Sequence, residues 1–269
     1  MAIIALNSSA TGLAAQEVAL DVIANNLANV NTSGFKRSRV NFQDLLYMQK
    51  KYPGVENARG DRRPIGLYIG LGVKVAGTQL DFRQGVAEET GRQLDLLIDG
   101  GGFFEVEIED NVGDGLGYTR AGHFTINEDG EMVLATDEGR RLLPNIIIPE
   151  DAVSVDITTD GVVSAEIAGE IDPTIVGQIE LATFINPQGL KQIGENLYIP
   201  TAASGDPLLG NPGEERRGVL RQFFLEGSNV EPVTELVSLI RTQRAFEFNT
   251  QALQAADETL RAVGNLRRF

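Results

Sequence analysis

Two apolar heptad repeats, one at each end of the sequence, most constrain what this chain can fold into. Near the start, leucine recurs every seven residues, at Leu6, Leu13, Leu20 and Leu27. Ile23 and other apolar residues stand three or four positions from these leucines, so a helix over about residues 2–30 carries one apolar face. An interval of seven residues is typical of helices that pack along one another.

The C-terminal repeat has the same interval. It comprises Leu239, Phe246, Leu253 and Leu260, with Leu236 and Ile240 on the same helical face. The pattern predicts a helix that begins near Pro232, because proline is favoured at the first helical position, and that ends near Gly264. We expect the two terminal helices to pair as a coiled coil, although the periodicity alone also fits helices that hold an ordinary domain together.

Two amphipathic helices make a thin bundle that leaves part of each apolar face exposed. Burying one Leu or Phe side chain contributes roughly 1.5–3 kcal/mol, and this gain is complete only when neighbouring helices cover both sides. The pattern therefore predicts self-assembly of identical copies into a helical filament. We expect the terminal helices to become ordered on assembly and to form the filament core.

The charge distribution argues against several classes of function. The formal net charge is −15, and residues 86–180 carry 22 Asp and Glu against 4 Lys and Arg. Nucleic-acid binding needs a basic surface, so we expect no nucleic-acid partner. The sequence contains no Cys, which excludes disulfide bonds and cysteine chemistry. No stretch is apolar for long enough to span a membrane, and no cleavable signal peptide is visible, so we expect no direct membrane insertion.

The middle of the chain has the pattern of an antiparallel β domain. Short apolar runs alternate with turn signals such as Asp99-Gly100 and Asp160-Gly161, and no helix of ordinary length is evident. The clearest predicted strands cover residues 103–108, 124–126 and 178–184. The fold class expected is therefore mixed α and β, with paired terminal helices, a central all-β antiparallel domain and a long hairpin arm.

The arm is predicted from the segment between the first helix and the β domain. Residues 40–47 read as a strand or a short helix, and residues 66–75 read as a returning strand. Between them lies a polar excursion with a basic tip, formed by Lys50, Lys51, Arg59, Arg62 and Arg63. The expected domains are 1–35 with 229–269 as the helical filament core, 36–80 as the arm, and 81–228 as the β domain.

No catalytic, cofactor or metal site emerges from the motifs. The glycines at 100–102 and 70–72 lack the residues that complete a nucleotide-binding loop, so tight turns explain them better. His123 is the sole histidine, and one imidazole without any Cys is a weak basis for a metal site or a catalytic triad. We therefore expect no enzyme activity and no cofactor.

The residues at both ends nevertheless resemble a known family. The N-terminal match comprises Thr11-Gly-Leu-x-Ala, Asp21-Val-Ile-Ala-Asn-Asn-Leu-Ala-Asn-Val30 and Thr32-x-Gly-Phe-Lys36, and so includes Asn25, Asn26, Asn29, Gly34 and Phe35. Further matches are Phe42-Gln-Asp-Leu-Leu-Tyr47, Gly102-Phe-Phe, Tyr118-Thr-Arg-x-Gly122-x-Phe124, Gly194-Glu-Asn-Leu-Tyr198, Glu226-x-Ser-Asn-Val230, Glu235-Leu-Val-x-x-Ile240 and Gln243-Arg-Ala-Phe-Glu-x-Asn249. Together they resemble the bacterial flagellar rod and hook family.

Within that family the segment from Gln43 to Gly66 resembles the one found in distal-rod members, where it is implicated in a straight, stiff rod. The resemblance implies a structural subunit of the distal rod that transmits torque from motor to hook. Implied partners are further copies of the chain, other rod proteins, hook subunits, the surrounding periplasmic and outer-membrane rings, and the type III export apparatus. It also implies a location in the rod where that crosses the periplasm, reached without a cleaved signal peptide.

The basic tip departs from the neutral composition expected of that segment. We therefore expect Arg62 and Arg63 to meet the acidic β domain of a neighbouring copy. Two other functions stay open. One is a proximal rod or hook subunit of the same family, and the other is a secreted β-domain binding module or enzyme with helices for oligomerisation.

Overall fold

The computed structural model describes residues 2–56, 62, 64–109, 115–169 and 172–266. It is a mixed α and β structure with a helix at each end and a β-rich middle, as the sequence predicts. The chain forms two compact units. The first unit is Met1–Ala28, Ser38–Gln79 and Glu231–Phe269, and the second is Asn29–Arg37 and Leu80–Val230.

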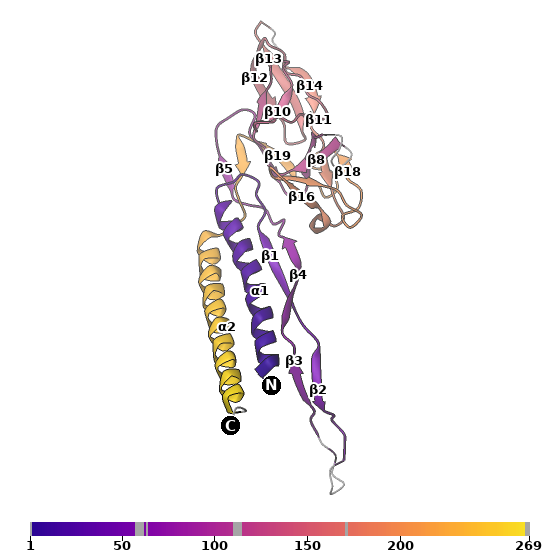
Figure 1. Cartoon of the computed structure of the whole chain (residues 1–269). Coiled ribbons are helices and arrows are strands. Elements are labelled where there is room, and N and C mark those ends of the chain that lie inside the picture. The colour runs from indigo at the N-terminus through magenta and orange to yellow at the C-terminus, as the bar shows by residue number, and fades with distance from the viewer. Residues whose placement is uncertain (1, 57–61, 63, 110–114, 170–171, 267–269) are drawn as a thin grey trace. The chain divides into compact units, whose positions relative to one another are not determined.

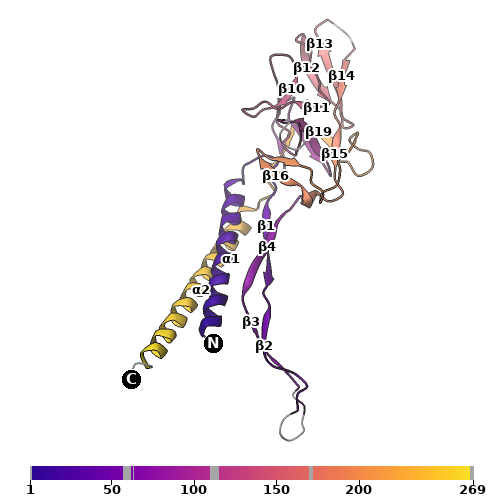
Figure 2. The ribbon, with the colours of Figure 1, turned by 45° about the vertical axis from the view of Figure 1, so that its right-hand side comes forward.

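The two long helices belong to the first unit. Helix α1 spans Ala2–Ala28 and helix α2 spans Pro232–Leu266, close to the predicted bounds. They run side by side, and the two chain ends lie at the same end of the pair (Figures 1 and 2). The Asn249 side chain of α2 packs on α1 at Gly12, where an added Cβ would lie 3.1 Å from it. Neither helix has an apolar run of membrane-spanning length in the residues that the structure describes.

The rest of the first unit is a hairpin made of two pairs of strands. Strand β1 (Ser38–Asp44) pairs with β4 (Val73–Leu80), and β2 (Tyr47–Lys51) pairs antiparallel with β3 (Leu67–Gly70). The segment read as a strand or a short helix is thus two strands. The predicted returning strand is also divided, because Gly72 adopts a φ of +117° between β3 and β4, which is a glycine conformation.

In the part of the chain that the structure describes, the second unit is built from short strands and includes the 3-10 helix η2 (Pro187–Gly189). The strands are β5 (Ala87–Glu89), β6 (Leu96–Asp99), β7 (Phe103–Glu107), β8 (Leu116–Thr119), β9 (Phe124–Ile126), β10 (Met132–Leu134), β11 (Leu142–Leu143), β12 (Ala152–Ile157), β13 (Val162–Ile167), β14 (Thr174–Gln178), β15 (Leu181–Thr183), β16 (Lys191–Gly194), β17 (Leu197–Ile199), β18 (Leu208–Gly210), β19 (Val219–Gln222) and β20 (Phe224–Glu226).

The largest sheet of this unit has the order β16-β17-β8-β7-β15-β18, with β11 also paired to β7. A three-stranded sheet, β12-β13-β14, and the pairs β10-β9, β19-β6 and β20-β5 complete it. All pairings with a described register are antiparallel, as predicted. The predicted strand over residues 178–184 is wrong as a single element, because β14 ends at Gln178 and β15 begins at Leu181, each in a different sheet.

The core of the second unit lies between these sheets. Its centre is formed by fully buried apolar side chains, among them Phe104 and Phe124, whose rings meet edge to face. A smaller aromatic cluster around Phe103, Tyr118 and Tyr198 lies beside it. Buried and more exposed residues alternate along β12 and β13, which is the period-two pattern of a strand with one covered face, whereas β6, β10 and β17 are buried at nearly every position.

Candidate functional site

The predicted self-assembly residues divide into a covered set and an exposed set. On α1, the side chains of the apolar face are partly buried, namely Leu6, Leu13, Leu20, Ile23 and Leu27. On α2, Leu239, Leu253 and Leu260 are also partly buried, whereas Leu236, Ile240 and Phe246 are exposed. The pairing of α1 with α2 therefore covers only part of the α2 apolar surface.

The exposed α2 row is larger than the heptad pattern predicts. It consists of Val233, Leu236, Val237, Ile240, Phe246 and Phe248. Val233 is 74% exposed and Phe248 67%, so these side chains are far from any core. Exposed apolar side chains gathered on one helix are typical of interaction surfaces, which makes this row a candidate for one. The heptad pattern does not include Val233, Val237 and Phe248, because these positions lie beside the seven-residue repeat and not on it.

The asparagine-rich end of α1 closes the turn into the hairpin. Asn26 is buried, and its side chain makes two hydrogen bonds to Ser38 in β1. Its Oδ1 accepts from the Ser38 N–H at 2.9 Å, and its Nδ2 donates to the Ser38 carbonyl at 2.9 Å. Asn25 is exposed, and Asn29 is partly buried and accepts a hydrogen bond from the Thr32 hydroxyl. One asparagine of this motif thus has a clear structural role within the first unit.

The hairpin arm presents both basic and apolar side chains to solvent. Lys50 and Lys51 are exposed, and Arg62 pairs with Glu56 at 3.4 Å between two exposed side chains. Arg59 and Arg63 lie outside the described residues. Large apolar side chains are exposed along the arm as well, at Leu46, Tyr47, Met48, Tyr52, Val55, Ile65, Leu67 and Tyr68. An isolated two-stranded hairpin is only marginally stable in water, so this arm favours a covering partner.

Three charged side chains from distant motifs meet inside the second unit. The Lys36 ammonium lies 2.5 Å from Glu226 Oε1, and Arg120 Nη1 lies 3.4 Å from Glu226 Oε2. Lys36 and Glu226 are fully buried, and the Arg120 side chain is 4% exposed. Burial lowers the pKa of Lys36 and of Arg120, and the Glu226 carboxylate opposes both shifts. We call these three residues the buried charge cluster.

Backbone groups satisfy much of the remaining hydrogen-bonding capacity of this cluster. Lys36 Nζ donates to the Arg83 carbonyl at 2.8 Å, and the Gly85 N–H donates to Glu226 Oε1 at 2.8 Å. Arg120 Nη2 donates to the Gly100 carbonyl at 2.7 Å. A buried charge is tolerated when it is paired and hydrogen-bonded in this way. The sequence motifs flagged all three residues, but nothing in the sequence indicates that they touch.

Gly34 and Phe35 stand beside the cluster. Gly34 has a φ of +72°, and a Cβ built on it would lie 2.7 Å from the backbone nitrogen of Ala121. The position therefore requires glycine both for conformation and for space. Phe35 is buried, and its carbonyl accepts a hydrogen bond from the Asn229 N–H at 3.3 Å. Gly34 thus packs directly on Arg120 and Ala121 of the 118–124 motif, within the second unit.

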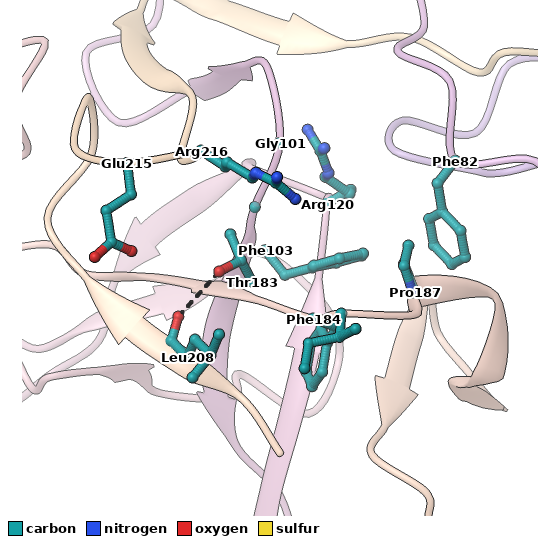
Figure 3. Close-up of a pocket in the computed structure, with 12 residues that line it drawn as sticks. Phe82, Gly101, Phe103, Arg120, Thr183, Phe184, Pro187, Leu208, Glu215 and Arg216 are labelled. Carbon is teal, nitrogen blue, oxygen red and sulfur yellow. Dashed lines mark hydrogen bonds between the residues drawn. The ribbon is translucent and has the colours of Figure 1, made fainter. Parts of the chain in front are cut away.

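A cavity of about 510 Å³ opens on the same unit. Figure 3 shows the rings of Phe82, Phe103 and Phe184 along it, with Arg216 extending over it. The Thr183 hydroxyl donates to the Leu208 carbonyl at 3.3 Å at its edge. The lining combines aromatic and aliphatic side chains with the polar side chains of Arg120, Thr183, Glu215 and Arg216.

His123, the sole histidine, is partly buried, and burial lowers the pKa of its imidazole. Within the described ranges, no three His, Cys, Asp or Glu side chains are grouped closely enough to hold a metal ion.

Comparison with known proteins gives three family matches along the chain. Residues 6–36 match the model "Flagella basal body rod protein", residues 97–165 match "Flagellar hook protein FlgE/F/G D1 domain", and residues 221–266 match "Flagellar basal body rod FlgEFG protein C-terminal". The buried charge cluster draws one residue from the first of these segments, one from the second and one from the third.

Whole-chain relatives agree with these matches. "Flagellar basal-body rod protein FlgG" of Borreliella burgdorferi is 42% identical over 266 residues, which is 98% of each chain. FlgG of Caulobacter vibrioides is 41% identical over 98% of this chain and 99% of its own, whereas FlgF of the same organism is 32% identical over 91% and 89%. The chain belongs to the family of flagellar basal-body rod proteins.

Proposed function

We propose that the protein is a structural subunit of the distal flagellar rod, without enzyme activity, that self-assembles into a helical tube and transmits torque from motor to hook. The observation that carries this proposal is the exposed α2 row. Higher identity to FlgG than to FlgF of Caulobacter vibrioides favours the distal type over other rod types. As a member of the rod family, the subunit assembles with other rod and hook components.

The exposed row supplies the driving force for assembly. Its six side chains are between 37% and 74% exposed, so complete burial removes about half of each from water. At roughly 1.5–3 kcal/mol for a full side chain, this contributes on the order of 5–10 kcal/mol per subunit. We propose that α1 and α2 form a coiled coil whose remaining apolar surface is covered by the helices of neighbouring copies, so that the terminal helices line the filament core.

Substitution on this row tests the proposal directly. Ile240→Glu places a charge in the proposed interface, and Gln251→Glu adds the same charge at an exposed polar position of the same helix. We expect filaments from the Gln251→Glu protein and none from Ile240→Glu, measured by sedimentation and electron microscopy of concentrated protein. Filaments of normal yield from Ile240→Glu would show that the row is not the interface.

We propose that the arm contacts a neighbouring copy through its basic side chains. Lys50, Lys51 and Arg62 are exposed, and the β region between residues 86 and 180 is strongly acidic, so opposite charges are available on the two surfaces. The exposed Arg62–Glu56 pair contributes little by itself and leaves the guanidinium accessible. Reversal of Lys50 and Lys51 to Glu should weaken assembly, and a compensating reversal of acidic residues on the β region should restore it. Failure of every rescue pair would count against this contact.

The finer setting of the subunit is also a proposal. Family membership supports passage through the flagellar type III export apparatus without cleavage, and a location where the rod crosses the periplasm. The acidic β region is suited to face the surrounding periplasmic and outer-membrane rings, because uniform negative charge disfavours adhesion as the rod turns. Hook subunits and other rod proteins are the expected axial neighbours.

A further inference from the structure

The chain passes between its two units at four points, after residues 28, 37, 79 and 230. Three short segments of the second unit stand next to the last three of these passages, namely residues 34–37, 81–85 and 226–229. They are far apart in the sequence, but all three converge on the buried charge cluster. Force carried along the backbone through these three passages enters the second unit through these segments.

Hydrogen bonds join the three segments to one another. The Asp81 N–H donates to the Arg37 carbonyl at 3.0 Å, and Arg37 Nε pairs with Asp81 Oδ2 at 3.3 Å. The Asn229 side chain connects both, since its Oδ1 accepts from the Arg37 N–H at 2.8 Å and its Nδ2 donates to the Asp81 carbonyl at 2.6 Å. The Gly34 N–H donates to the Glu226 carbonyl at 2.7 Å. None of these three segments can therefore move without breaking hydrogen bonds to another.

Arg120 anchors this junction to the β structure. It follows β8 directly and donates to the carbonyls of Ile98 and Gly100, at the end of β6, as well as to Glu226. Its guanidinium also lies over the Phe103 ring of β7, 5.4 Å from the centroid. The cluster thus fastens all three segments to the central strands.

We propose that the buried charge cluster and Asn229 form a mechanical clamp that makes the three passage segments resist force as one body. Bonds loaded together share the force, whereas separate segments would peel away one after another. A buried ion pair adds little net stability compared with apolar packing. Separating its partners is nevertheless costly, because each is left as an unpaired buried charge, so the pair holds the segments in one particular arrangement. This inference concerns a single subunit and goes beyond rod assembly.

Hydrogen exchange on the dilute full-length protein tests the clamp without requiring filaments. In Glu226→Gln, amide exchange at Gly34, Arg37 and Gly85 should accelerate about 100-fold, while amides of the central strand β7 should change by less than about tenfold. Glu128→Gln removes the same charge from the exposed surface of the same unit and should change none of these amides. Equal acceleration throughout the unit would overturn the clamp, as would unchanged exchange at the junction.

Single-molecule pulling adds the mechanical readout. Because the sequence has no Cys, the pulling handles attach only to the two cysteines introduced by Ala5→Cys and Asp129→Cys, one in each unit. The parent protein should extend the second unit in one step, and Glu226→Gln should show an additional step at lower force. An unchanged force distribution would overturn the proposal.

A second variant keeps the test decisive if Glu226→Gln fails to fold. Asn229→Ala removes hydrogen bonds between passages without isolating a charge, and exchange at Arg37 should accelerate about tenfold. Asn186→Ala, which removes one exposed side-chain hydrogen bond elsewhere in the unit, should have no effect there. Equal behaviour of the two alanine variants would overturn the clamp.

Discussion

A single added methyl group at Gly34 should reveal how tightly this residue packs on Arg120 and Ala121 within the second unit. Its φ of +72° is a conformation that L side chains rarely adopt, and an added Cβ would lie 2.7 Å from Ala121 N and 2.8 Å from the Arg120 carbonyl carbon. Gly91 offers a matched control in the same unit. It has a φ of +70°, but nothing lies within 4 Å of its added Cβ.

The two substitutions separate backbone strain from steric overlap. Gly91→Ala should cost only the left-handed conformation, about 1–2 kcal/mol. Gly34→Ala adds overpacking against backbone atoms that cannot rotate away, typically a further 1–3 kcal/mol, which gives roughly 2–5 kcal/mol in total. For a unit of this size 1 kcal/mol lowers Tm by about 2–4 °C, so Gly34→Ala should melt roughly 2–12 °C below Gly91→Ala.

Near-ultraviolet circular dichroism is the appropriate assay, because Tyr118 and Tyr198 are buried in the second unit and report on its packing. We expect a thermal transition in this signal for both variants, at a clearly lower temperature for Gly34→Ala. The same Tm in both proteins would refute the reasoning, since it would mean that residues 34 and 121 are not packed as described.

The other predictions concern acid stability, stiffness and helix order. Hydrogen bonds from Arg83 lower the pKa of Asp81 from 3.8 to about 2, so its contribution to stability is present above about pH 4 and is lost as the pH falls through 2. Asp81→Asn should therefore reduce the loss of unfolding free energy between about pH 4 and pH 2, whereas Asp129→Asn should leave this loss unchanged. Deleting residues 43–66 should make assembled filaments bend more in electron micrographs, and unchanged stiffness would favour a proximal rod or hook subunit. Far-ultraviolet circular dichroism should gain helical signal as filaments form, and a constant signal through assembly would contradict ordering on assembly.

Local patterns predict the helices and most strands because they need only near neighbours in the sequence. Pro232 and the heptad residues define α2 within a few positions, and alternation identifies β9. The break between Gln178 and Leu181 was missed, because it depends on two different sheets receiving the adjoining strands. Local sequence patterns predict the two halves of the hairpin arm, but they do not predict the pairing of Tyr47 with Gly70.

The buried charge cluster lies beyond such reasoning. Lys36 and Glu226 are 190 positions apart, and each resembles an ordinary surface charge in its local context. Family motifs flag the residues without indicating what they contact. Similarly, the heptad pattern locates the apolar face of α2 but cannot tell which side chains α1 covers. Phe248 therefore appears as part of the exposed row only once the two helices are placed together.

The most direct test of the account is an electron-microscopy reconstruction of filaments grown from the purified full-length protein. The account predicts a tube whose inner wall consists of α1 and α2, with Leu236, Ile240 and Phe248 buried against the helices of neighbouring copies. A filament in which these three side chains stay exposed to solvent, or in which contacts between copies involve the β structure alone, would contradict it.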